Sequence, residues 1–439
     1  GVGDSGMPET LEEGSILVAH DLAPSDTACL DVHKVSAMLL DKGGKTSHTA
    51  ILARSLGIPA VVGLQNVTAS IQSGDTVLVD GDSGEVTVNP SKDECSAFKE
   101  RLDAQSRKKG QLSLLKDLPS VTKDGRKVEL AANIGGANEI DMVNDAGAEG
   151  IGLFRTEFMF IQVTEMLTEE EQFRVYKKVL SELSPRPVVI RTLDAGSDKE
   201  LPYLNMPKED NPFLGLRAIR LCLQEKERAF RPQLRALLRA SVYGKLRIMF
   251  PMIASLQELR EAKAELLSVK AELDAERISV SEDLQVGIMV EVPSAAICSD
   301  ELASECDFFS IGTNDLTQYT LAVDYTMACD RGNAAISYLS DYFYPSVLRL
   351  IARTIEEGHK QGIWVGMCGE MAGSPAAIPV LIGMGIDELS MATGAIPQAK
   401  AIIRGMDTGK AKEIWERVKG MSSNKEIRAY LDGLVAEQQ

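Results

Sequence analysis

The sequence predicts an α/β protein that consists of a small β/β/α domain, a helical linker and a (β/α)8 TIM barrel. Three observations lead to this prediction. Residues 1–90 alternate short apolar runs with turn residues, and residues 91–120 form a charged stretch of helical character. In residues 121–439, eight short β-prone runs alternate with longer segments of helical period. Eight such βα units are typical of a closed parallel barrel.

In the small domain, turn residues such as Gly74-Asp75 separate the short apolar runs. The expected strands are Ser15–Ala19, Ala37–Leu40, Pro59–Val62, Thr76–Val79 and Glu85–Val88. We expect two helices among them, one after Ser25 and one that begins at His48. Asn89-Pro90 ends this domain.

The predicted linker begins with Ser91 and Glu94, which have the spacing of a capping box. A charged helix is expected to follow to about residue 115. Because charged residues dominate it, we interpret this stretch as a solvated helical linker.

The eight expected barrel strands are bounded by segments of helical period. They are Val128–Ile134, Gly150–Phe154, Val188–Arg191, Leu246–Met252, Val286–Glu291, Phe308–Asp315, Trp364–Gly369 and Glu388–Ala392. Three residue pairs mark helix starts between these strands. These pairs are Thr168 with Glu171, Ser255 with Glu258, and Ser374 with Pro375.

Composition limits the classes of function. The net charge of −17 argues against non-specific binding to nucleic acid and to anionic membranes. The seven cysteines form no CxxC pair, which favours reduced thiols in the cytoplasm over disulfides or a zinc site. We find no signal peptide and no membrane-spanning apolar run, and the first residues read as a cut or flexible terminus.

Several barrel strands are expected to end in polar residues. In a parallel barrel such positions meet at the C-terminal rim, where active sites are built. A single one can be a polar side chain that meets solvent, but five on one rim predict a site. The five segments are Arg155-Thr156-Glu157, Arg191-Thr192-Leu193-Asp194, Glu291, Asn314-Asp315 and Cys368-Gly369-Glu370.

The charges of these residues indicate the kind of ligand. Arg155 and Arg191 can each bind a phosphate or carboxylate through two parallel hydrogen bonds. Three further cationic side chains that could bind the same groups are Lys199, Arg217 and Arg331. Glu291 and Asp315 offer the hard oxygen ligands that Mg²⁺ prefers, and Asn314 can hydrogen-bond a phosphate oxygen. We therefore expect a small polyanionic substrate bound together with Mg²⁺.

A separate candidate site lies in residues 41–63. The pair Gly43-Gly44 leads through Thr46 and Ser47, which can cap a helix, into His48. His48 would then lie in the first helical turn, where free backbone N–H groups favour an anion. A histidine there can carry a phosphoryl group. The alternative is an exposed histidine at a helix start that has no chemical role.

The stretch GGKTSHTAILARSLGIPAVVG resembles the phosphohistidine signature of Enzyme I, the phosphoenolpyruvate–protein phosphotransferase family of the bacterial sugar phosphotransferase system. Eight further segments occur in the order of that family. They are GLFRTEFMF, VIRTLDAGSDKELPY, NPFLGLRAIR, LRIMFPMI, GIMVEVPSA, FFSIGTNDLTQYTLAVD, DRGN and GMCGEMAG. The resemblance covers nearly the whole chain.

The resemblance implies a swivelling phosphohistidine domain in residues 1–90 and a phosphoenolpyruvate-binding barrel in residues 121–439. It implies that His48 accepts the phosphoryl group, that Cys368 protonates the departing enolate, and that Glu291 and Asp315 bind Mg²⁺. The carrier protein HPr would be the next acceptor, and the barrel would form a homodimer. The implied contacts of the substrate are Arg155, Arg191, Lys199, Arg217, Asn314 and Arg331.

Three departures from the family pattern are visible. We expect the helical domain that docks HPr to be absent, so that the chain phosphorylates itself without passing the group to HPr. Six additional residues, Tyr325–Asp330, precede Arg331 and put its position in doubt. The Tyr-x-Pro of the family is replaced by Ser340-Asp341-Tyr342.

Two alternatives remain open at this point. The chain resembles, more distantly, the carboxy-terminal part of pyruvate phosphate dikinase or phosphoenolpyruvate synthase, which share a histidine domain followed by a barrel. A non-catalytic paralogue that senses phosphoenolpyruvate is the other alternative. The presence of His48, Glu291, Asp315 and both strand-end arginines argues against it.

Overall fold

The computed structural model describes residues 11–22, 34–43, 49–50, 53, 58–196, 201–204, 206–324, 328, 333 and 335–436. They fall into two compact units. One unit falls within Gly1–Gln111 and Thr326–Ala334, and the other falls within Leu112–Tyr325 and Ala335–Gln439. The predicted domain boundaries at residues 90 and 120 stay predictions.

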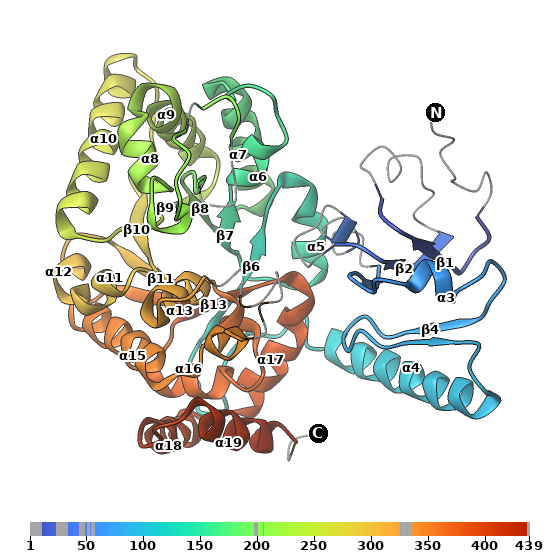
Figure 1. Ribbon diagram of the computed structural model, residues 1–439. Coiled ribbons are helices and arrows are strands. Elements are labelled where there is room, and N and C mark those ends of the chain that lie inside the picture. Colours follow the sequence, from blue (N-terminus) through green and yellow to red (C-terminus); the bar gives the residue numbers. More distant parts are fainter. Residues whose placement is uncertain are drawn as a thin grey trace, which may run out of the picture. The chain divides into compact units, whose positions relative to one another are not determined.

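The first unit contains two small sheets (Figure 1). One is parallel and has the order β1 (Ser15–Ala19), β2 (Val35–Leu40), β3 (Ala60–Val61). The other is an antiparallel pair, β4 (Val77–Val79) and β5 (Val86–Val88). All five predicted strands are thus confirmed. Successive residues of β2 point to opposite faces, and both faces are covered by apolar side chains.

The helices of this unit agree with the predictions as far as the structure describes them. Thr49, Ala50 and Ala53 are helical, whereas His48 and the helix expected after residue 25 lie outside the described residues. The charged helix is confirmed as α4 (Lys92–Ser113), with a short helix α3 (Val67–Ser70) before it. No residue of α4 is buried. The capping box at its start is present, since Glu94 N donates to Ser91 Oγ over 3.2 Å.

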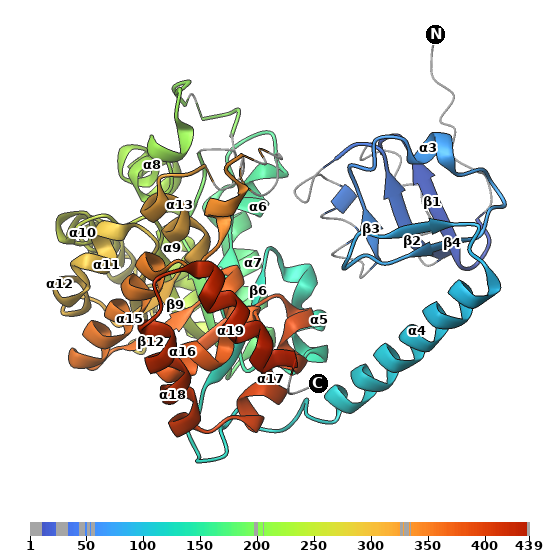
Figure 2. The ribbon, with the colours of Figure 1, turned by 60° about the horizontal axis from the view of Figure 1, so that its bottom comes forward.

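The second unit is a closed barrel of eight parallel strands that helices surround, as Figure 2 shows. All eight predicted strands are confirmed. They follow each other around the barrel in chain order as β6 (Glu129–Ile134), β7 (Ile151–Arg155), β8 (Pro187–Arg191), β9 (Lys245–Phe250), β10 (Gln285–Val290), β11 (Phe308–Ile311), β12 (Trp364–Met367) and β13 (Glu388–Met391).

The helices of the barrel unit bury apolar faces against the strands. Those between the strands are α5 (Ile140–Asp145), α6 (Glu157–Ile161), α7 (Glu169–Leu183), α8 (Ile219–Gln224), α9 (Arg231–Ala240), α10 (Leu256–Ala275), α11 (Pro293–Ile297), α12 (Ser299–Ala303), α13 (Thr313–Leu321), α15 (Pro345–Lys360) and α16 (Ile378–Met384). After β13 come α17 (Ile396–Gly405), α18 (Thr408–Lys419) and α19 (Asn424–Ala436).

Two of the three predicted helix starts are confirmed. Thr168 and Ser255 cap α7 and α10, and each side chain accepts a bond from the backbone N–H three residues later. The start predicted at Ser374-Pro375 is wrong, because α16 begins at Ile378. There the backbone carbonyl of Ser374 closes a turn with Ala377 N over 3.0 Å before the helix starts.

The departure at residues 340–342 has a structural explanation. The carboxylate of Asp341 accepts hydrogen bonds from Arg428 over 2.7 Å and from Asn424 over 3.1 Å, and both donors belong to α19. The Arg428 guanidinium also lies 4.8 Å from the centre of the Phe343 ring. The altered segment therefore attaches the last helix to the barrel.

Two expectations from composition can be compared with the structure. The five cysteines that the structure describes are all free thiols. Within the described part of the chain, each helix is either too short or too polar to cross a membrane.

A buried carboxylate lies where the barrel strands begin. Glu388, the first residue of β13, pairs in register with Glu129, the first residue of β6. Arg247 Nη1 lies 3.7 Å from Glu388 Oε2 and 3.6 Å from Glu129 Oε1, and its guanidinium covers the Trp364 ring. Burial and the nearby Glu129 raise the pKa of Glu388 to about 8.

This pKa predicts how the stability of the barrel depends on pH. As the pH rises from 4.5 toward about 8, the unfolded chain loses a proton that the folded chain keeps, so the free energy of unfolding falls. In the Glu388→Gln variant this fall should be smaller by on the order of 2–4 kcal/mol. Urea unfolding at the two ends of this range measures it. The exposed Glu282→Gln variant is the control, and an equal fall in both variants would contradict the prediction.

Candidate active site at the barrel rim

Four of the predicted site residues lie at the C-terminal ends of the barrel strands. Arg155 and Arg191 are the last residues of β7 and β8, Glu291 follows β10, and Cys368 follows β12. The expected strand Phe308–Asp315 is too long, because β11 ends at Ile311. Asn314 and Asp315 therefore lie in the first turn of α13.

The structure brings seven of the ten predicted site residues to this rim. These are Arg155, Arg191, Arg217, Glu291, Asn314, Asp315 and Cys368. The other three, His48, Lys199 and Arg331, lie outside the described residues. For these three the assigned roles remain predictions.

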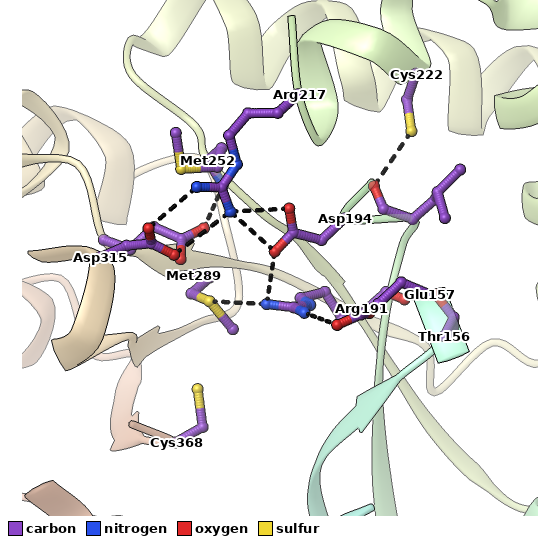
Figure 3. A network of polar contacts seen from close by, with 12 residues as sticks. Thr156, Glu157, Arg191, Asp194, Arg217, Cys222, Met252, Met289, Asp315 and Cys368 are labelled. Atoms are coloured by element: carbon purple, nitrogen blue, oxygen red, sulfur yellow. Dashed lines mark hydrogen bonds and ion pairs between the residues drawn. The ribbon is translucent and has the colours of Figure 1, made fainter. Parts of the chain in front are cut away.

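A chain of buried ion pairs links four elements of the rim (Figure 3). Arg191 lies 2.7 Å from Glu157 and 3.1 Å from Asp194. Arg217 lies 3.0 Å from Asp194 and 3.1 Å from Asp315. We call these five residues the rim ion-pair chain. Alternating charges at these distances allow both guanidinium groups to stay ionised although they are buried.

Glu157 and Asp194 were not predicted to have a role in the site. Both lie in the predicted rim segments, two and three residues after a strand-end arginine. The signal was the acidic residue that closely follows each of these arginines. Asp194 is the more important omission, because its carboxylate bridges Arg191 and Arg217.

The arginines differ in their electrostatic surroundings. For Arg191, burial opposes the charge, but Glu157 and Asp194 outweigh it and raise the pKa. For Arg217, burial likewise opposes the charge, and Asp194 and Asp315 raise the pKa. For Arg155, burial lowers the pKa more than the nearby charge of Glu157 raises it. The Nε atoms of all three arginines lack a hydrogen-bond partner among the described residues, so they do not distinguish Arg155; the net lowering of its pKa does. Arg155 is thus the rim cation best placed to accept an incoming anion.

Glu291 shows how a cation would fit this rim. Its Oε1 accepts a hydrogen bond from Met252 N over 2.6 Å, and burial followed by the charges of Asp315 and Asp194 raises its pKa well above the usual range. A cation beside Glu291 and Asp315 would remove this repulsion. Within the described ranges no three His, Cys, Asp or Glu side chains form a metal cluster. One or two carboxylates, completed by water and substrate oxygens, suit Mg²⁺.

Cys368 lies beside the first turn of α13. Burial raises the pKa of its thiol to about 12, so the thiol stays protonated at neutral pH. Gly369 makes the close approach possible, because a Cβ there would overlap Thr313 at the start of α13. Asn314 Oδ1 in the same turn accepts from Glu370 N over 3.4 Å. A protonated thiol therefore faces the same rim as the arginines.

Known proteins resemble this chain over nearly its full length. The family model for the PEP-utilising enzyme, PEP-binding domain, matches residues 109–408, and that for the PEP-utilising enzyme, mobile domain, matches residues 11–84. Phosphoenolpyruvate-protein phosphotransferase from Staphylococcus carnosus is 50% identical over 96% of this chain and 72% of its own length. The protein of the same name from Bacillus subtilis is 51% identical over 97% of this chain and 73% of its own length.

Among solved structures, a solution structure of Enzyme I (nEIt) is 49% identical over 22% of this chain and 39% of that chain. Its TM-score is 0.21, so the relationship to known proteins rests on the sequence matches.

The bridging position of Asp194 predicts a large loss of stability when it is removed. In the Asp194→Ala variant Arg191 and Arg217 lose their common carboxylate, and removing one member of a buried ion pair costs about 3–5 kcal/mol. We expect urea unfolding to show this loss, and added inorganic phosphate to restore part of it. The exposed Asp283→Ala variant is the control. A loss as small as that of the control would contradict the role of Asp194.

Proposed function

Because the chain belongs to the phosphoenolpyruvate-protein phosphotransferase family, as the resemblance to Enzyme I predicted, we propose that its rim binds phosphoenolpyruvate and that His48 accepts the phosphoryl group. The chain is an enzyme of phosphoryl transfer from phosphoenolpyruvate to protein. The observation that carries the assignment of the site is the rim ion-pair chain, with Arg155 beside it, whose charge is the least compensated of the three arginines.

When the substrate binds, its anionic groups would replace protein carboxylates as partners of the arginines. Phosphoenolpyruvate carries a phosphate and a carboxylate, and Arg155, Arg191 and Arg217 present guanidinium groups that bind either one. Asn314 would donate from the first turn of α13. Lys199 and Arg331 are proposed as additional contacts because of their positions in the family motifs.

Glu291 and Asp315 would hold Mg²⁺ at this rim. Burial raises the pKa of Glu291 first, and the charges of Asp315 and Asp194 raise it further; the part due to these charges supports the proposal, because a cation would offset it. When bound, Mg²⁺ neutralises charge on the transferring phosphoryl group.

The chemical step uses two side chains of this chain. A nitrogen of the neutral His48 imidazole forms a bond to phosphorus, the bond from phosphorus to the enol oxygen breaks, and its electron pair stays on that oxygen. The resulting enolate takes a proton at C3 from the Cys368 thiol, which then regains one from water. The products are phospho-His48 and pyruvate.

The later steps and the assembly of the protein are also proposals. We propose that residues 1–90 move as a swivelling domain on the helical linker 91–120, so that His48 alternates between the rim and the next acceptor. That acceptor is HPr. We further propose a homodimer through the barrel. The net charge of −17 gives no support for nucleic acid as a partner.

The relatives favour this function over the two alternatives from the sequence analysis. Those at about 50% identity carry the name of the phosphotransferase, not of a dikinase or of phosphoenolpyruvate synthase. A non-catalytic sensor can be told from the phosphotransferase by experiment, because the sensor would bind phosphoenolpyruvate without gaining a phosphoryl group.

The function is tested by intact-mass analysis after incubation with phosphoenolpyruvate and Mg²⁺. We expect one acid-labile phosphoryl group that maps to His48 and that a chelator prevents. His48→Ala should abolish the gain and leave phosphoenolpyruvate binding intact, while His359→Ala on α15 is the control. Binding without any gain in the unaltered chain would favour the sensor. Loss of binding in His48→Ala would count against separate binding and acceptor sites.

Arg155 provides the sharper test of the substrate site. Replacing Arg191 would remove its ion pairs with Glu157 and Asp194, whereas Arg155 forms no ion pair with a described residue. Arg155→Ala should weaken phosphoenolpyruvate binding by about 10- to 100-fold, the value of a hydrogen bond to a charged group. Calorimetry measures it, with the exposed Arg349→Ala on α15 as control. An unchanged affinity would refute the role of Arg155.

A further inference from the structure

A hydrogen-bonded bracket of side chains crosses neighbouring strands inside the barrel and ends at Cys368. Ser390 Oγ on β13 donates to Asn133 Oδ1 on β6 over 2.6 Å. Asn133 Nδ2 then donates to the backbone carbonyl oxygen of Cys368 over 2.9 Å. Because β13 lies between β12 and β6, Asn133 reaches past one strand to the residue that follows β12. We call Ser390 and Asn133 the inner bracket.

The hydrogen bond from Asn133 fixes the backbone of Cys368, which lies beyond the last residue of β12 that pairs with β13. The backbone pairing of β12 with β13 ends at Met367, so β13 does not pair with Cys368. On the other side, Cys368 N donates to Ile311 O over 3.1 Å. The peptide groups around Cys368 are thus fixed from β11 by the N–H and from β6 by the carbonyl. Fixing them sets the direction in which the thiol leaves the backbone.

The barrel interior leaves space for the bracket at one position. A Cβ at residue 152 on β7 would overlap the Ser390 side chain, and Gly152 provides the room. Ser390 is fully buried, and each polar atom of the bracket that is described above has a partner. Breaking a buried hydrogen bond of this kind leaves a partner unsatisfied, which costs about 1–3 kcal/mol. The bracket is therefore a rigid support.

We infer that Asn133 and Ser390 are positioning residues that aim the Cys368 thiol at C3 of the enolate, an inference that rests on the proposed function. Neither residue is among the groups assigned to the substrate. Arg191 and Arg217 have other partners, on α6, in the segment after β8 and on α13. Loss of the bracket should therefore disturb the proton step and spare phosphoenolpyruvate binding.

The proton step can be followed separately from phosphoryl transfer. In D₂O the full chain, with phosphoenolpyruvate, pyruvate and Mg²⁺ present, should exchange the methyl hydrogens of pyruvate for deuterium. In this reverse direction the C3–H bond breaks, its electron pair forms the enolate and the Cys368 thiolate takes the proton. Nuclear magnetic resonance of the methyl group gives the rate, after subtraction of the rate without protein.

The variants are Asn133→Ala, Ser390→Ala, Cys368→Ala and the double variant of Asn133 and Cys368. We expect each bracket variant to slow exchange about tenfold or more, since small misplacements of a reacting group have such effects. The affinity for phosphoenolpyruvate should stay within about twofold. The double variant should be no slower than Cys368→Ala alone. Asn133→Asp keeps the acceptor for Ser390 but loses the amide donor, so it should be as slow as Asn133→Ala.

Thr354→Ala is the matched control, because it removes a buried hydroxyl from α15 outside the barrel interior. Normal exchange in Asn133→Ala beside slow exchange in Cys368→Ala would overturn the inference alone. An equal fall in exchange and in phosphoenolpyruvate affinity would also overturn it, because it would indicate a general loss of site structure. Normal exchange in Cys368→Ala would overturn both this inference and the acid role of Cys368.

Discussion

The site depends on the need to neutralise buried arginines at the barrel rim. Two guanidinium groups that lie this far from water require carboxylates at hydrogen-bonding distance, and α6, the segment after β8 and α13 supply them. The same need fixes how these elements approach one another. An anionic substrate can then bind by replacing these carboxylates as partners of Arg191 and Arg217, whereas Arg155 forms no ion pair with a described residue that would have to be exchanged.

Buried charges are compensated in different ways at the two ends of the barrel. At the rim, several carboxylates and arginines alternate, so the pKa values of Arg191 and Arg217 rise and the arginines stay ionised. Where the strands begin, one buried arginine serves two glutamates, and Glu388 keeps its proton to higher pH. The charges that a substrate could exchange thus lie at the rim, where barrel active sites lie.

Most of the fold could be predicted from the sequence because its strands are short apolar runs with clear ends. The rim could be predicted for the same reason, since Arg155, Arg191 and Glu291 stand where those runs stop. The bridging role of Asp194 and the anchoring of α19 by Asp341 could not, because they depend on residues far apart in the chain. The helical setting of Asn314 and Asp315 was missed because only Gly312 separates the end of β11 from the start of α13. His48, Lys199 and Arg331 rest on the sequence alone.

Titration calorimetry of phosphoenolpyruvate binding to the His48→Ala chain, with and without Mg²⁺, tests most directly whether the rim holds substrate and cation together. Without the acceptor histidine, binding is measured apart from transfer. We predict that Mg²⁺ tightens binding about tenfold or more, and that Asp315→Asn and Glu291→Gln each remove this gain. Equal affinity with and without Mg²⁺, or a gain that survives both substitutions, would contradict the assignment of the rim carboxylates.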